Sequence, residues 1–317
     1  MSADRGWRRK VTKSALRGSY SLLAATILVC TIAKSDNVRE RNQKALFRVS
    51  VNTVFLRVSV TDRFNRCFTG LGKENFKIYE DKVQQEISIF TQEPSPVSIG
   101  IVLDTSGSMK ARNNMHEARM ALKRFLANVN PGDEFLLITF NGEVSLQSNF
   151  THDTASILGQ SALAMPSGST AIKDAVYLAL GKMKWAKNEK RGIVLITDGE
   201  DNSSRYSLGE VRDFARESDT RIYAIGRLGE LGYGSLEINN IVEMTGGRAF
   251  FPNNLSTLDS FIGLIQSELR NEYIIGYVPV HLEHNGKWRK VDVKLDVPEQ
   301  FPKLTVRTKE GYYALKN

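Results

Sequence analysis

Apolar residues in the middle of the chain alternate between short continuous runs and helically spaced positions. Residues 99–103 and 193–196 are uninterrupted apolar runs, as expected for strands buried on both faces of a parallel sheet. Residues 115–129 and 171–184 place apolar side chains at helical spacing. This alternation predicts a doubly wound α/β fold with a mostly parallel sheet over residues 97–272. The same pattern predicts further strands over 135–140 and 221–225 and further helices over 208–218, 236–244 and 256–270.

Period-two alternation marks β segments on both sides of this region. The first segment spans residues 47–93 and the second spans residues 273–317, and each is too small to bury a core alone. We therefore expect the two segments to pair into one β-sandwich, with the α/β domain inserted between them. Two separate β appendages are the alternative.

The first 33 residues have the pattern of an export signal. A basic stretch ends at Arg17, and an uncharged stretch with an apolar centre at 22–29 follows it. The apolar part is shorter than the roughly 20 residues that a spanning helix needs. Residues 1–33 are thus predicted to be a signal peptide or an N-terminal anchor, followed by a polar linker over 34–46. We expect an exported protein that is periplasmic, secreted or anchored, with membrane contact only through this segment.

Composition and charge narrow the classes of partner. A hydrophobic fraction of 41% and a charged fraction of 25% are ordinary for a globular protein. The formal net charge is +8, but residues 1–33 hold six basic residues against one acidic residue and so carry +5 of it. The rest of the chain has no basic stripe interleaved with aromatic residues, so nucleic acid is not an expected partner.

Oxygen-bearing side chains follow the buried strands of the predicted sheet. Asp104, Ser106 and Ser108 come directly after the first strand, Asp198 follows the strand over 193–196, and Thr170 opens a predicted helix. Ligands of open parallel sheets bind beyond the carboxyl ends of the strands. Because hard cations prefer oxygen ligands, the pattern predicts a site for Mg²⁺, with Mn²⁺ or Ca²⁺ as alternatives.

These residues resemble the metal-ion-dependent adhesion site of von Willebrand factor type A (vWA) domains. The resemblance implies that Ser106 and Ser108 bind the metal through their hydroxyls, and that Thr170 binds it directly or through water. Asp104 and Asp198 would supply negative charge, partly through waters. One coordination position would stay open for a carboxylate. We therefore expect a protein-binding or adhesion module that grips an Asp or Glu side chain of a protein partner.

Two further acidic residues, Glu200 and Asp201, lie next to this pattern and are candidates to modulate metal or ligand binding. The alternative is that they are solvated loop charges. Flanking segments, among them Val58 to Asp62 and Gly311-Tyr312-Tyr313, resemble those of a bacterial subfamily of exported vWA-related proteins.

Catalysis is not expected. An enzyme needs an activated acid, base or nucleophile, and none of the four histidines stands at a strand end beside the aspartates. The sequence also lacks a nucleophile elbow and a P-loop. The alternatives to a binding module are a metal-assisted hydrolase, since a metal with bound water can act as a catalyst, and a structural scaffold of the cell envelope.

Overall fold

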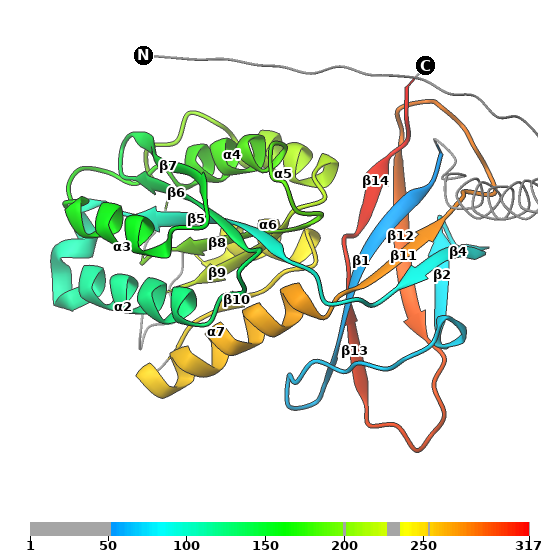
Figure 1. Ribbon diagram of the computed structural model, residues 1–317. Helices are drawn as coiled ribbons and strands as arrows, with labels where there is room; N and C mark the ends of the chain where they lie inside the picture. The colour runs from blue at the N-terminus through cyan, green and yellow to red at the C-terminus, as the bar shows by residue number, and fades with distance from the viewer. Residues whose placement is uncertain (1–51, 199–200, 227–234, 253, 317) are drawn as a thin grey trace, which may run out of the picture. The chain divides into compact units, whose positions relative to one another are not determined.

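The computed structural model describes residues 52–198, 201–226, 235–252 and 254–316. The predicted signal segment and linker lie outside the described residues, as do residues 47–51 of the first β segment. Figure 1 shows an α/β part, which runs from β5 to α7, and a part made of strands. In the described ranges no helix combines the length and the apolar character needed to cross a membrane.

A six-stranded sheet is the centre of the α/β part, in the order β10-β9-β8-β5-β6-β7. Neighbouring strands are parallel except for β6 and β7. All residues of β5, β6 and β9 are buried, because helices cover both faces of the sheet. The strands are β5 (Val97–Asp104), β6 (Glu134–Phe140), β7 (Val144–Thr151), β8 (Lys190–Ile196), β9 (Arg221–Ile225) and β10 (Ala249–Phe250).

The helices divide between the two faces because successive strand side chains point in opposite directions. Ile101 belongs to the core that includes α2, α3 and α7, whereas Val102 belongs to the core that includes α4, α5 and α6. This arrangement confirms the predicted doubly wound α/β fold. The helices are α2 (Asn114–Ala127), α3 (Thr154–Leu163), α4 (Ile172–Met183), α5 (Leu208–Glu217), α6 (Ser235–Met244) and α7 (Leu255–Arg270), with a 3-10 helix η2 (Gly107–Asn113) before α2.

Two elements, β7 and α3, escaped the sequence pattern. Strand β7 is an antiparallel edge strand with no fully buried residue, so it carries no continuous apolar run. Helix α3 buries only Ile157 and Ser161, which is too few for a helical period to stand out. Both are marginal elements whose structure depends on packing against β6 and its neighbours.

The remaining strands form two four-stranded sheets with the orders β13-β1-β11-β4 and β14-β12-β2-β3. Strand β1 pairs with β11 and β13, and β2 pairs with β12, so strands from before and after the α/β part share both sheets. One apolar cluster, which includes the fully buried Leu56 of β1 and Ile78 of β2, is common to the two sheets. The flanking segments thus join into one sandwich. Its strands are β1 (Val54–Asp62), β2 (Phe76–Glu80), β3 (Val83–Gln85), β4 (Ile87–Thr91), β11 (Tyr273–Tyr277), β12 (Trp288–Leu295), β13 (Leu304–Arg307) and β14 (Gly311–Tyr313), with a 3-10 helix η1 (Lys73–Asn75) before β2.

Lys190, the first residue of β8, bonds to both chain segments that connect the sandwich strands to the α/β part. Its buried amine donates to the backbone oxygen of Glu93 at 2.9 Å and to that of Arg270 at 2.5 Å. Glu93 lies between β4 and β5, and Arg270 ends α7. Burial lowers the pKa of this amine, while the carboxylate of Glu272 opposes the effect.

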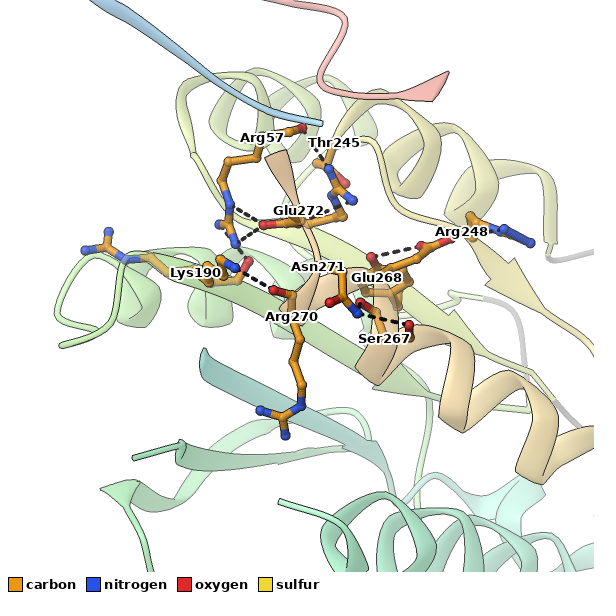
Figure 2. A network of polar contacts seen from close by, with 12 residues as sticks. Arg57, Lys190, Thr245, Arg248, Ser267, Glu268, Arg270, Asn271 and Glu272 are labelled. Atoms are coloured by element: carbon orange, nitrogen blue, oxygen red, sulfur yellow. Dashed lines mark hydrogen bonds and ion pairs between the residues drawn. The ribbon is translucent and has the colours of Figure 1, made fainter. Parts of the chain in front are cut away.

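Glu272, between α7 and β11, is fully buried, and Arg57 lies beside it (Figure 2). Nε of Arg57 donates to its carboxylate at 2.8 Å, and Nη1 of Arg221 forms an ion pair with it at 3.3 Å. Because Arg57 lies on β1 and Arg221 on β9, one carboxylate connects a sandwich strand with a strand of the central sheet.

We predict that Glu272→Ala strongly destabilises the fold, because it removes the carboxylate that buried Arg221 and partly buried Arg57 share. Loss of one partner from a buried ion pair costs about 3–5 kcal/mol, so the free energy of unfolding in urea should fall by about that amount. The control is Glu299→Ala at an exposed position, with an expected change within about 0.5 kcal/mol. Equal unfolding free energies for the two variants would contradict the role given to Glu272.

Candidate functional site

Asp104 ends β5 at the centre of the sheet, and its side chain is fully buried. One carboxylate oxygen accepts a hydrogen bond from the backbone N–H of Ser106 at 2.7 Å. The other accepts from the hydroxyl of Thr197 at 2.6 Å. Thr197 directly follows β8, so a single carboxylate ties together the loops that leave two neighbouring parallel strands.

A chain of hydrogen bonds continues from Ser106 to the second aspartate. The hydroxyl oxygens of Ser106 and Ser108 are 2.9 Å apart, and the Ser108 hydroxyl donates to Asp198 at 2.8 Å. Helix η2 begins at Gly107 between the two serines, so its turn brings their side chains together. Four of the five predicted ligands are therefore in continuous contact.

Thr170 is brought to this loop by backbone bonds. Gly107 N–H donates to the oxygen of Gly168 at 2.9 Å, and Ser167 N–H donates to that of Thr105 at 2.8 Å. Gly168 has a φ of +73°, which glycine adopts at no steric cost. Thr170 lies two residues before α4, whose N-cap is Ala171, so the threonine is not the helix cap. The structure places Thr170, buried, between the metal-loop candidates and the loop after β8.

Asn202 joins Thr170 to the loop that follows β8. Its side-chain oxygen accepts from the Thr170 N–H at 2.8 Å, and its own N–H donates to the Thr170 oxygen at 2.9 Å. The three loops that carry the predicted site residues are thus bonded to one another pairwise.

Sequence reasoning missed Asn114, the first residue of α2. Its side-chain N–H₂ donates to Asp198 at 2.5 Å and to the backbone oxygen of Ser108 at 3.3 Å. Its Oδ1 is buried and has no hydrogen-bond partner. A cavity of about 30 Å³ adjoins it, with Asn114, Glu117 and Asp198 among its mostly apolar lining, and this volume is room for a water molecule. A polar residue opening a helix ten positions after Asp104 was the only sequence signal.

The two additional acidic candidates have different outcomes. Glu200 lies outside the described residues. The carboxylate of Asp201 accepts from the N–H of Lys173 at 2.8 Å, forms an ion pair with the Lys173 amine at 3.5 Å, and also bonds the hydroxyl of Ser204. Asp201 therefore serves the start of α4, and a role in binding stays a prediction.

The electrostatics of the cluster fit a cation. Burial raises the pKa of the Asp104 carboxyl and the charge of Asp198 adds to the effect, while hydrogen bonds from Thr197 and Ser106 oppose it. A positive ion would relieve this repulsion between two carboxylates. The donors that converge are carboxylate and hydroxyl oxygens, which suit Mg²⁺, Mn²⁺ or Ca²⁺. Within the described residues no group of three or more His, Cys, Asp or Glu side chains could hold a metal, so any site here relies on the hydroxyls.

Comparisons with known proteins agree with the fold. Residues 99–200 match the family model of the von Willebrand factor type A domain. The inter-alpha-trypsin inhibitor heavy chain H4 of Sus scrofa is 26% identical over 133 residues, which are 39% of this chain and only 14% of the length of that relative. A von Willebrand factor type A structure from Catenulispora acidiphila superposes with a TM-score of 0.51 at 13% identity, over 86% of this chain and 76% of its own.

A further solved structure is the proximal thread matrix protein 1 of the mussel byssus with a zinc-occupied MIDAS motif. It has a TM-score of 0.47 and 21% identity, over 59% of this chain and 48% of its own. At 13% identity the likeness to the Catenulispora acidiphila structure shows the fold alone, and the candidate ligands of this chain rest on its own geometry.

We predict that Asn114→Ala weakens divalent metal binding about 10- to 100-fold, the usual effect of removing a residue that orients a ligand. Without its amide, Asp198 loses the bond that fixes one carboxylate oxygen. Asn240→Ala, at an exposed position of α6, is the control. The measurement is calorimetric titration with Mn²⁺ and Mg²⁺, and an unchanged dissociation constant in Asn114→Ala would contradict the orienting role.

Proposed function

The chain carries a von Willebrand factor type A domain, and on this premise we propose that it binds a divalent cation and uses the cation to grip an acidic side chain of a protein partner. The proposed ligands are Asp104, Ser106, Ser108, Thr170 and Asp198, with Mg²⁺ as the first candidate ion. The observation that supports this best is the unbroken hydrogen-bonded chain from Asp104 through both serines to Asp198.

The incomplete coordination of the ion favours an acidic ligand. Two carboxylates balance a divalent ion, whereas the hydroxyls are neutral ligands that leave its coordination shell incomplete. Mg²⁺ demands near-octahedral coordination by oxygen, so a carboxylate of a partner can fill a position otherwise taken by water. Exposed Lys110, two residues after Ser108, adds a positive charge that attracts such a partner.

We propose binding rather than catalysis because the side chains gathered at this site are suited to hold a cation and are already hydrogen-bonded to one another. The ring of His152 bonds to the backbone oxygen of Asp133 at 2.6 Å. Asp133 precedes the first residue of β6, whereas Asp104 pairs with its last residue, Phe140. This histidine therefore belongs to the opposite end of the sheet from the aspartate cluster.

We also propose that the domain works outside the cytoplasm, on the basis of the signal pattern in residues 1–33. Cells that express the full-length chain should yield it in the periplasmic, membrane or secreted fraction. Recovery in the cytosolic fraction alone, against a cytosolic marker, would contradict this proposal.

The test of metal binding uses the full-length chain and Ser108→Ala, with Ser148→Ala on the edge strand β7 as the matched control. Thermal unfolding is followed in EDTA and in Mg²⁺, Mn²⁺ or Ca²⁺, each with and without N-acetylglutamate amide. An ion at about 100 times its dissociation constant should stabilise the parent and the control by about 2.7 kcal/mol. The gain should shrink in Ser108→Ala and grow with the glutamate ligand.

A parent that unfolds at the same temperature in EDTA and in every ion would overturn the proposal. Equal stabilisation of Ser108→Ala and the parent would remove the Ser108 hydroxyl from the ligand set.

A further inference from the structure

Five consecutive apolar residues lie at the surface between α3 and the loop that carries Thr170. They are Ala162, Leu163, Ala164, Met165 and Pro166, and we call them the apolar ledge. Leu163 and Met165 are each 76% exposed. Ala162 is also exposed, whereas Ala164 and Pro166 are partly buried. Exposed apolar residues that cluster in this way are disfavoured at a soluble surface unless they have a function.

Arg119 of α2 holds the ledge in a defined position. Its guanidinium donates to the backbone oxygens of Ser161, Ala162 and Ala164 at 3.2, 3.1 and 2.7 Å. The first two belong to the last turn of α3, whose carbonyls have no partner within the helix. One side chain thus caps α3 and fixes the direction in which the chain leaves it. A surface that is already ordered loses less entropy when a partner binds.

The ledge is continuous with the candidate metal site. Ser167, two residues after Met165, donates its N–H to the oxygen of Thr105, which lies between the proposed ligands Asp104 and Ser106. The side chain of Asn141 donates to the Ser167 hydroxyl at 3.3 Å. The ledge therefore borders the loop that would hold the cation, with no intervening element.

The lack of charged residues in this segment favours an apolar partner over a densely acidic one. The sequence from Thr154 to Ile172 contains no charged residue, and the cation nearest the ledge, Arg119, already donates to three backbone oxygens of this segment. Apolar side chains of a partner gain by covering Leu163 and Met165, because apolar area leaves water. A densely acidic surface would lose hydration there without compensation.

We propose that the apolar ledge is the second half of the binding surface, and that the partner is a protein segment with one acidic side chain flanked by apolar residues. This inference rests on the proposed function, because the acidic side chain is the one that the cation would hold. The ledge adds selection among acidic partners, which the cation alone does not provide.

The experiment compares two capped pentapeptides with a central glutamate, flanked by leucine in one and by serine in the other. Both are titrated into the full-length chain in Mg²⁺ and in EDTA. The parent should bind the leucine-flanked peptide about tenfold more tightly in Mg²⁺, as expected from partial burial of two apolar side chains. The double variant Leu163→Ser/Met165→Ser should lose this preference and keep its stabilisation by Mg²⁺.

Trp185→Ser is the matched control, because Trp185 is 84% exposed and follows α4 at the far end of that helix. It should retain the full preference. Arg119→Gln should retain both apolar side chains and metal stabilisation but bind the leucine-flanked peptide more weakly.

The outcomes separate the two proposals. A parent without stabilisation by any divalent ion refutes the proposed function and this inference together. A parent that binds metal but favours neither peptide, or a double variant that keeps the preference, refutes the apolar ledge alone.

Discussion

The position of β5 is the constraint on which the candidate site depends. It is hydrogen-bonded to β6 on one side and to β8 on the other, and helices bury both of its faces. Its last residue, Asp104, is therefore shielded from bulk water, and its carboxylate needs hydrogen-bond donors from the protein. Neighbouring loops supply them because parallel strands end at the same edge of the sheet. The loops that bond to this buried carboxylate also carry the hydroxyls of the candidate site.

Much of the fold and the position of the candidate site could be predicted from the sequence, because both depend on the local pattern of apolar and polar residues. A strand buried on both faces must be an apolar run, and the residue after it must lie at the sheet edge, so Asp104 and Asp198 could be placed without a structure. Pairing between the flanking β segments was expected from their size, since neither could bury a core alone, although size did not exclude two separate β appendages. The doubly wound fold is confirmed, whereas the metal ligands stay a prediction that the geometry supports.

What escaped the sequence depends on contacts between distant residues. Asn114 looks like an ordinary polar residue at a helix start, and only the approach of α2 to the loop after β8 gives its amide a partner in Asp198. Arg119 looks like a solvated charge on an amphipathic helix until the end of α3 lies beside it. Edge strand β7 has no apolar run, because one side of it meets solvent. These features arise from tertiary packing, for which propensity is a weak guide.

The hydrogen bonds of the Lys190 amine have a consequence for the evolution of such a chain. By bonding to the oxygens of both Glu93 and Arg270, it holds the first and last connections of the α/β part side by side. Insertions of whole domains are tolerated where the two ends of the guest lie close together at a surface loop of the host. The sandwich strands can therefore close their sheets whether the guest is long or short. A sandwich of this kind permits recombination, in which one inserted domain replaces another while the strand order of the sandwich is preserved.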